Sequence, residues 1–201
     1  MKRWVALVLV PAAVVLAAAG CGGRAGEVAG GTAGTVQAGR SGAALCVPSP
    51  AASVAPAPGR AAQRLPDLTL PCLRAGADTP IAHLGTAAIV NLWASWCGPC
   101  RQELPAFQRY ADRAGDRVLV IGVDTKDRRP AAESLAGELG LRLPMLYDRD
   151  GALLAAVGRT ALPVTLFVDA GGGIAYLYNA QALDEATLQT LAAQHLGVVL
   201  P

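Results

Sequence analysis

The chain has 201 residues, of which 53% are hydrophobic and 16% are charged, and its formal net charge is +2. This length suits one domain with additional segments, because a domain typically contains about 100–150 residues. The small net charge offers no electrostatic footprint for nucleic acid, so we expect no nucleic-acid partner. Five cysteines are present, and an odd number cannot all be paired within one chain.

The N-terminus has the pattern of a secretory signal. Lys2 and Arg3 precede an apolar run over 4–19, and small residues close the run before Cys21. A membrane span needs about 20 apolar residues, whereas this run is shorter and contains a proline. We therefore predict a signal peptide over 1–20, with an uncleaved membrane anchor as the alternative.

The end of this run, Ala18-Ala19-Gly20-Cys21, resembles the lipobox of bacterial lipoproteins, although Ala18 stands where that family usually has Leu. In lipoproteins, signal cleavage leaves a lipid-modified cysteine at the new N-terminus. The resemblance implies lipidation of Cys21 and a chain held on the extracytoplasmic face of the cell membrane. A chance cysteine after an ordinary cleavage site is the alternative.

Residues 22–60 are dominated by Gly, Ala, Pro, Ser and Thr, and they have no apolar periodicity. Such a segment buries too little surface to offset the entropy lost on ordering. We predict that the lipidated Cys21 and a flexible spacer occupy 21–64 and connect the membrane to a folded domain over 65–201. Cys46 lies inside this spacer.

From about residue 65 onward, apolar runs alternate with amphipathic segments. The run over 87–93 is nearly continuous, as expected for a strand buried on both faces. Pro130 suits a first helical turn, and Asp184 suits an N-cap. In chain order, we expect a short strand over 67–70, a strand over 87–93, a helix over 98–113 interrupted by Pro105, a strand over 118–123, a helix over 130–139, strands over 164–168 and 174–178, and a helix over 184–196. This order predicts an α/β domain with a mixed sheet.

The segment Trp96-Cys97-Gly98-Pro99-Cys100 lies between the strand predicted over 87–93 and the following helix. Two cysteines with this spacing at such a junction are typical of a redox dithiol. Cys97 would lie at the helix N-terminus, where free N–H groups favour the thiolate and lower its pKa to about 3.5–7.5. We predict that Cys97 attacks a substrate disulfide and that Cys100, one turn later, resolves the mixed disulfide.

An inert disulfide and half of a zinc site are the alternatives to a redox dithiol. A zinc site needs a second pair of ligands at suitable spacing. The remaining candidates, Cys46, Cys72, His83 and His195, are irregularly spaced along the chain. We therefore expect no metal site.

The residues over 90–105, which include Trp93 and the two cysteines, resemble the thioredoxin superfamily. More narrowly, they are similar to its TlpA-like branch of membrane-tethered, extracytoplasmic proteins, which includes the reductases of cytochrome c maturation. The resemblance extends from about residue 65 to residue 196. It implies a thioredoxin-like three-layer fold, with a central mixed β-sheet flanked by helices, and a thiol–disulfide oxidoreductase that works without a cofactor.

The resemblance also implies a substrate-binding surface around the dithiol. Leu162-Pro163 precedes a predicted strand at about the place where the family has a cis-proline facing the cysteines. In that family the residue before the proline pairs its backbone with the substrate, which implies this role for Leu162; a plain turn residue is the alternative. Trp96, Gly98 and Pro99 would complete the surface, with Trp96 shielding the dithiol and contacting a partner.

One departure from the family concerns the group that accepts protons. Thioredoxins proper have a buried Asp in the strand before the motif, where this chain has Asn91, and an amide cannot accept the proton that leaves Cys100. TlpA-like proteins commonly have an acid three residues after the second cysteine, which implies this role for Glu103. A partly buried carboxyl there would have a raised pKa and could transfer protons. A solvated Glu, favoured by the helix dipole, is the alternative.

Cys46 and Cys72 lie outside the motif, and two such cysteines are expected to pair in an oxidising compartment. The bond would close a loop of about 26 residues and stabilise the domain by roughly 3 kcal/mol. We predict a structural disulfide that ties the spacer to the domain. A second redox partner for Cys97 or Cys100 is the alternative.

Together these patterns predict a lipid-anchored enzyme that reduces the disulfides of exported proteins. Its partners would be exported proteins with disulfides or thiols and, because the chain has no electron source of its own, a membrane electron donor. Gly98-Pro99 is the dipeptide of reducing thioredoxins, whose potential is about −270 mV. The alternatives are an oxidant that forms disulfides in secreted proteins, a peroxide-reducing thiol enzyme and, in another class, a copper or haem chaperone.

Overall fold

The computed structural model describes residues 46–47 and 62–200. The predicted signal peptide, Cys21 and most of the predicted spacer lie outside these residues. The elements in chain order are β1 (Thr69–Leu70), β2 (Thr79–Pro80), β3 (Ala88–Trp93), α1 (Gly98–Ala114), the 3-10 turn η1 (Gly115–Arg117), β4 (Leu119–Thr125), α2 (Arg129–Glu138), β5 (Met145–Asp148), α3 (Ala152–Ala156), β6 (Val164–Val168), β7 (Ile174–Tyr178) and α4 (Glu185–Leu196). Within the described part of the chain, every helix is too short or too polar to cross a bilayer.

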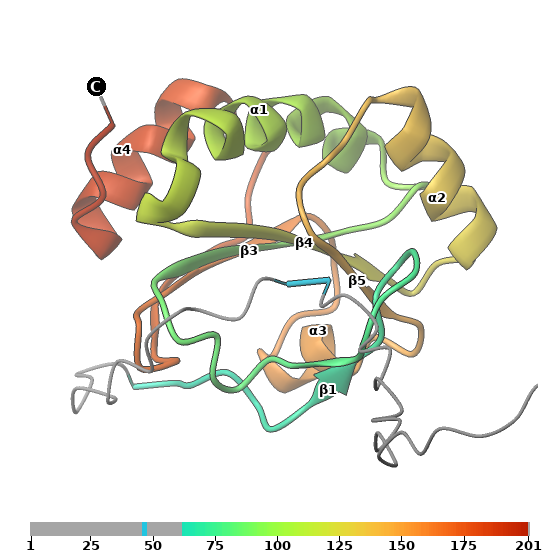
Figure 1. The fold of residues 1–201 in the computed structure, drawn as a ribbon, viewed down its shortest axis with the longest axis horizontal. Coiled ribbons are helices and arrows are strands. Elements are labelled where there is room, and N and C mark those ends of the chain that lie inside the picture. Colours follow the sequence, from blue (N-terminus) through green and yellow to red (C-terminus); the bar gives the residue numbers. More distant parts are fainter. Residues whose placement is uncertain (1–45, 48–61, 201) are drawn as a thin grey trace, which may run out of the picture. The chain divides into compact units, whose positions relative to one another are not determined.

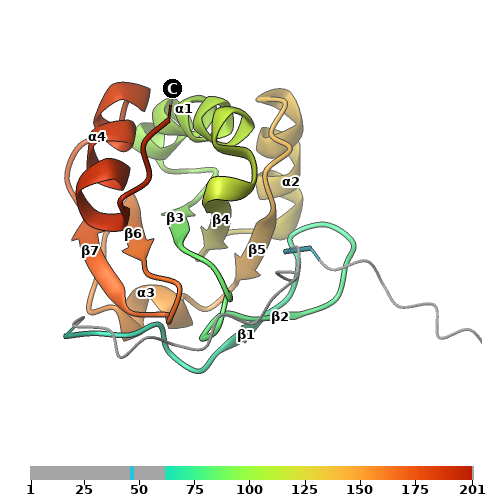
Figure 2. The same ribbon diagram turned by 60° about the vertical axis from the view of Figure 1, so that its left-hand side comes forward.

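Five strands form one mixed sheet in the order β5-β4-β3-β6-β7. The central strand β3 pairs in parallel with β4 and antiparallel with β6. Figure 1 shows α1, α2 and α4 on one face of this sheet, with α3 and β1 on the other. Figure 2, turned by 60°, shows the five strands side by side in the same order. The predicted three-layer α/β fold with a central mixed sheet is confirmed.

The sheet has a hydrophobic core on each face, which explains the nearly continuous apolar sequence of β3. All six of its residues are buried. Ile89 and Trp93 pack into the core beneath α1, whereas Leu92 packs into the core on the α3 side. Gly122 of β4 is required beside Trp93, because a Cβ there would lie 2.9 Å from the indole nitrogen. Trp93 is thus a core residue.

The predicted helix boundaries agree with the structure to within a few residues. α1 continues through Pro105 instead of being interrupted there, although proline has no N–H to donate to the carbonyl four residues earlier. Asp184 caps α4 as predicted, because its side chain accepts from the Thr187 N–H at 2.8 Å. Gly197 ends α4 with a φ of +68°, a conformation that favours glycine.

The sequence patterns missed β2, β5 and α3, and the strand expected over 67–70 is reduced to the two residues of β1. β1 pairs with β2 in a small separate sheet. β5 has four residues and α3 has five, which is too short for a clear periodicity. α3 also depends on Asp148, whose carboxylate accepts from the N–H groups of Ala152 and Leu153 at 2.8 and 3.0 Å.

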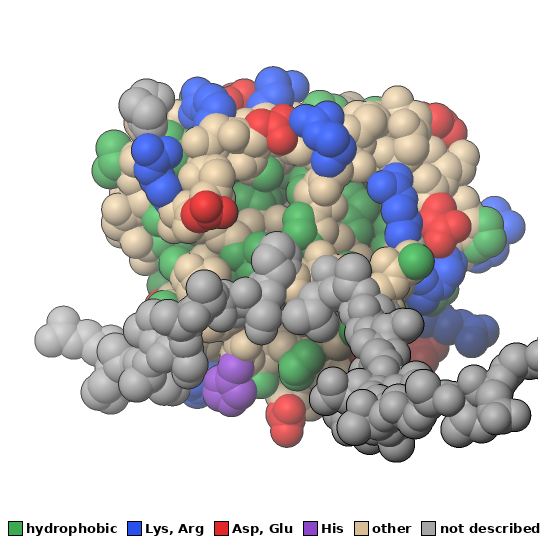
Figure 3. All heavy atoms as spheres, viewed as in Figure 1, with side chains coloured by type: hydrophobic (Ala, Val, Ile, Leu, Met, Phe, Trp, Pro, Cys, Tyr) green, Lys and Arg blue, Asp and Glu red, His purple; other side chains and the backbone are tan. Residues whose placement is uncertain are grey.

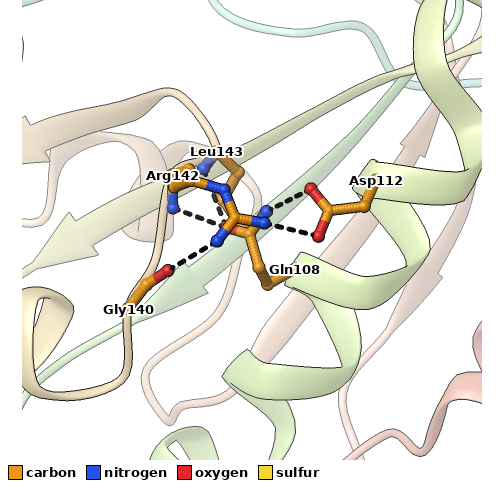
Figure 4. Close-up of polar contacts among 5 residues, drawn as sticks. All are labelled: Gln108, Asp112, Gly140, Arg142 and Leu143. Carbon is orange, nitrogen blue, oxygen red and sulfur yellow. Dashed lines mark hydrogen bonds and ion pairs between the residues drawn. The ribbon is translucent and has the colours of Figure 1, made fainter.

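The middle of α1 is joined to the loop between α2 and β5 by a set of polar contacts, drawn in Figure 4. The side-chain oxygen of buried Gln108 accepts from the backbone N–H groups of Arg142 and Leu143 at 2.5 and 3.0 Å. The Gln108 amide donates to Asp112 at 2.8 Å, and the Arg142 guanidinium reaches the same carboxylate at 2.7 Å. These contacts fix α1 over the sheet and hold the chain that leads into β5.

One face of the molecule carries charged side chains of both signs over its helices (Figure 3). On the face in Figure 3, basic and acidic side chains are interspersed along the upper rim, over the helices, and hydrophobic side chains occupy the middle. Two of the ion pairs join α1 to α4, since Glu185 contacts Arg109 at 2.8 Å and Arg113 at 3.3 Å. These two ion pairs therefore help to hold α4 against α1.

Candidate active site

The two motif cysteines lie where β3 passes into α1, and they are joined by a disulfide with a Cα–Cα distance of 5.3 Å. Cys97 is the N-cap of α1, with an extended backbone, and Cys100 is in the first helical turn. The Cys97 sulfur accepts from the Cys100 N–H at 3.3 Å. A sulfur in this position is favoured as a thiolate once the bond is reduced, because the N–H group and the positive end of the helix dipole both face it.

Both motif cysteines are buried, Cys97 slightly less than Cys100. Cys97 is 5% exposed and Cys100 is 0% exposed. Gly98 and Pro99 are exposed beside them, and the Trp96 side chain is 62% exposed. The Trp96 indole N–H donates to the Lys126 carbonyl at 3.0 Å, so this large apolar ring is held in place although solvent surrounds most of it.

The loop after β4 supports the active-site loop. Because β3 and β4 are parallel, both strands end at the same edge of the sheet. There the Asp127 carboxylate accepts from the Ser95 N–H at 2.5 Å and from the Arg128 N–H at 2.6 Å. Sequence reasoning missed this role of half-buried Asp127. The shared strand edge was the signal that could have found it.

The Leu162–Pro163 peptide bond is cis, as the family resemblance implies. Leu92 of β3 pairs with Val164 of β6, so Pro163 comes next to the end of β3 from which the cysteine loop departs. The Asn179 amide, which follows β7, donates to the Pro163 carbonyl at 2.7 Å. Asn179 was missed because it lies 16 residues away in sequence and belongs to no motif.

Glu103 is buried in α1, one turn beyond Cys100, so the two side chains share a helix face. It is 1% exposed. Its two oxygens accept from the Asn91 amide at 2.7 Å and from the Leu183 N–H at 2.9 Å. Burial raises the pKa of Glu103 to about 7, against the lowering effect of these two hydrogen bonds. The alternative of a solvated first-turn Glu is therefore wrong.

Comparison with known proteins agrees with this geometry. The family described as Redoxin matches residues 60–194, more than half of the chain. The chain belongs to the Redoxin family. A thiol:disulfide interchange protein DsbE of Allochromatium vinosum is 38% identical to this redoxin, over 66% of the chain and 75% of the relative. A thiol-disulfide oxidoreductase ResA of Geobacillus thermodenitrificans is 27% identical, over 63% of the chain and 73% of the relative.

Among solved structures, a secreted Mycobacterium tuberculosis disulfide oxidoreductase homologous to DsbE is similar to this redoxin, with a TM-score of 0.57 and 25% identity. The match covers 64% of the chain and 96% of that structure. The predicted membership of the thioredoxin superfamily, in its TlpA-like branch, is confirmed. The chain is a thiol–disulfide oxidoreductase of the ResA and DsbE type.

A second buried acid of this redoxin lies on the same sheet face, and sequence reasoning missed it. Asp124 of β4 pairs in register with Trp93 and is 0% exposed. Within the described residues, neither of its carboxylate oxygens has a hydrogen-bond partner. Burial and the nearby Asp127 raise the pKa of Asp124 to about 8, while Arg129 opposes the shift. An acid directly after the apolar run over 118–123 was the available signal.

The cysteines outside the motif are not bonded to each other in this redoxin. Both are thiols, and the Cys46 sulfur donates to the Met145 carbonyl at 3.0 Å while the Cys72 sulfur donates to the Ala77 carbonyl at 3.2 Å. In this structure both sulfurs are in the thiol form and each donates to a carbonyl, so the predicted disulfide stays a prediction. Both residues lie beside β5, because the Cys46 sulfur contacts Met145 and Cys72 pairs with Leu146.

Neither histidine has a recorded contact with the cysteines of the motif. His83 is exposed, and the His195 ring stacks on Tyr176 with 4.0 Å between ring centroids. Over residues 46–47 and 62–200, no three His, Cys, Asp or Glu side chains are grouped so that they could hold a metal ion.

Proposed function

We propose that this redoxin is a membrane-tethered, extracytoplasmic reductase of disulfides in exported proteins, with Cys97 as nucleophile and Cys100 as resolving thiol. The observation that carries the proposal is the Cys97 sulfur at the N-terminus of α1, where it accepts the Cys100 N–H at 3.3 Å. This position stabilises a thiolate on the cysteine that is nearer the surface.

In the first step, the Cys97 thiolate attacks one sulfur of a substrate disulfide. The substrate S–S bond breaks, a Cys97–substrate S–S bond forms, and the released substrate sulfur takes a proton from solvent. In the second step, Cys100 loses its proton and attacks the Cys97 sulfur. The second substrate sulfur leaves as a thiol, and the enzyme is left with the Cys97–Cys100 disulfide.

Glu103 is the proposed acceptor of the Cys100 proton. Its carboxyl shares a helix face with Cys100, and its pKa of about 7 lets it both take up and release a proton near neutral pH. The Asn91 amide supports this role by donating to one carboxylate oxygen, which holds the carboxylate in place without competing for the proton.

The substrate polypeptide would bind across the exposed side of the motif. Trp96, Gly98 and Pro99 offer an exposed surface beside Cys97. Among the described residues, no hydrogen bond uses the backbone N–H or carbonyl of Leu162, so these groups are available to pair with an extended substrate segment next to cis Pro163.

The extracytoplasmic location is supported by the N-terminal sequence and by the relatives. The signal pattern over 1–20 and Cys21 favour export and a lipid tether, and one similar structure is of a secreted protein. A membrane electron donor of the dithiol class would return the Cys97–Cys100 disulfide to its reduced form. Within exported substrates, the resemblance to the TlpA-like branch favours proteins of cytochrome c maturation.

A trapping experiment tests this function. In cells that produce the full chain with Cys100→Ser, mixed disulfides at Cys97 should accumulate, because the resolving thiol is missing. The captured proteins identify the substrates, and the matched variant Cys97→Ser/Cys100→Ser should capture none. In the wild-type chain, Cys97 and Cys100 should be mainly reduced in cells, with a potential near about −270 mV. A mainly oxidised pair with a potential near about −120 mV would show an oxidant instead.

A further inference from the structure

Cys46 and Cys72 meet at one edge of the main sheet. β5 is the last strand at this edge. Cys72 pairs with Leu146 of β5 in an antiparallel bridge, and the Cys46 sulfur donates to the carbonyl of the preceding Met145 at 3.0 Å. Two residues 26 positions apart in sequence therefore come to the same place on β5.

The segment that carries Cys72 is firmly held there. Two backbone hydrogen bonds of 2.8 Å join residues 71–73 to β5. The Arg129 guanidinium donates to the Cys72 carbonyl at 2.6 Å and also to the Leu73 carbonyl. Cys72 is 2% exposed. Its sulfur thus has a fixed position from which to form a bond.

The segment that carries Cys46 is held by an apolar contact. Val47 is 6% exposed and belongs to the core on the α3 side, together with Leu70 and Leu146. Burial of this side chain directly after Cys46 sets the thiol against β5. The positions of the two sulfurs therefore follow from the packing of both segments, the one that carries Cys46 and the one that carries Cys72.

We propose that Cys46 and Cys72 form a second disulfide, which fastens the chain that precedes the domain to the β5 edge. Both S–H bonds break and one S–S bond forms between the two sulfurs. Two protons pass to solvent, and two electrons pass to the disulfide of an oxidant, which becomes a pair of thiols. In the cell, this step requires the oxidising extracytoplasmic compartment and therefore rests on the proposed function. For the purified chain, oxidised glutathione is the oxidant.

The local environment makes this bond structural. An attacking thiolate reaches the Cys72 sulfur poorly, because this residue is 2% exposed. Attack on the Cys46 sulfur instead has to expel the Cys72 sulfur, which lies in a segment that β5 and Arg129 hold in place. The Cys97–Cys100 pair has the opposite character, because its outer sulfur is favoured as a thiolate. The second bond should thus persist under conditions that open the active-site bond.

Peptide mapping of the full chain tests the proposal. The purified, reduced chain is incubated in a glutathione redox buffer, free thiols are alkylated in acid-quenched denaturant, and trypsin is added without reductant. Cleavage after Arg and Lys places Cys21, Cys46, Cys72 and the active-site pair on four separate peptides, over 4–24, 41–60, 65–74 and 75–101. We expect peptide 41–60 linked to peptide 65–74. Alkylation of both peptides, or a link from 41–60 to 75–101, would overturn the proposal.

Graded reduction and matched variants complete the test. The bond within 75–101 should open at a dithiothreitol concentration at least about ten-fold lower than the link between 41–60 and 65–74. Opening of both bonds at the same concentration would overturn the structural role.

The link between 41–60 and 65–74 should also form in Cys97→Ser/Cys100→Ser. Under non-reducing conditions, Cys46→Ser should lower the melting temperature by about 10 °C, and an unchanged value would overturn the fastening. None of these readouts depends on trapping with Cys100→Ser, so the two proposals fail separately.

Discussion

The side-chain amide of Asn91 donates a hydrogen bond of 2.7 Å to a carboxylate oxygen of Glu103, and both side chains are buried. The same amide donates to the Thr165 hydroxyl at 3.2 Å. The strand therefore contributes a neutral donor, and the carboxylate comes from α1, one turn after Cys100. Thioredoxins proper have a buried Asp in this strand, where the present chain has Asn91. The site nevertheless keeps a buried acid, because Glu103 lies on the helix that carries the resolving thiol.

The first prediction concerns the pH dependence of the active-site thiols. Burial raises the pKa of Glu103 to about 7 in the structure with the Cys97–Cys100 disulfide. Once the disulfide is reduced, the negative charge of an ionised Glu103 disfavours the thiolates beside it. Glu103→Gln removes that charge, so the thiol titration should shift to lower pH and lose its inflection near pH 7. The rate of alkylation of Cys97 between pH 5 and 9 measures this. Glu138→Gln, at an exposed position of α2, should leave the titration unchanged, whereas an unchanged titration in Glu103→Gln would remove the proposed proton acceptor.

Much of the site could be predicted because its chemistry is local in sequence. The spacing of Cys97, Cys100 and Glu103 within one helix start fixes their common face, and the apolar run of β3 fixes the strand that delivers them. The role of Glu103 was implied by the resemblance to TlpA-like proteins, which commonly have an acid at this place, whereas its hydrogen bond with the distant Leu183 could not be read from the sequence.

The missed residues act across the fold. Asp127 reaches Ser95 from 32 residues away, and Asn179 reaches Pro163 only because β7 folds back beside β6. No spacing rule connects such pairs, since they depend on which strands become neighbours. β5 was missed for the same reason, because a four-residue strand is recognisable mainly by the partner with which it pairs.

The second prediction concerns stability and Asp124. The folded chain keeps a proton on this carboxyl up to about pH 8, whereas an unfolded Asp releases it near about pH 4. Between these values the folded state binds more protons, so the free energy of unfolding falls as the pH rises, by at most about 1.4 kcal/mol per pH unit. Asp124→Asn has no proton to lose. The free energy of unfolding of Asp124→Asn, minus that of the wild type, should therefore increase from pH 5 to pH 8.

Urea unfolding at several pH values measures this difference. The charges that act on Asp124 are those of Asp127 and Asp148, which raise its pKa, and of Arg129, which lowers it. Asp150→Asn, at an exposed position, is the matched control and should follow the wild type at every pH. Parallel curves for Asp124→Asn and the wild type would mean that Asp124 is already ionised in the folded chain.

The last prediction concerns the contacts that hold α1 over the sheet (Figure 4). Gln108→Ala removes the acceptor for the N–H groups of Arg142 and Leu143, and Leu143 is buried, at 7% exposure. An unpartnered buried N–H costs about 1–3 kcal/mol, so the free energy of unfolding should fall by that amount. Gln102→Ala, at an exposed position of the same helix, should change it by less than about 0.5 kcal/mol. Because Gln108 faces the loop before β5 and not the cysteines, the alkylation rate of Cys97 in the folded variant should equal that of the wild type. A stability loss no larger than that of Gln102→Ala would show that water replaces the side-chain oxygen at this junction.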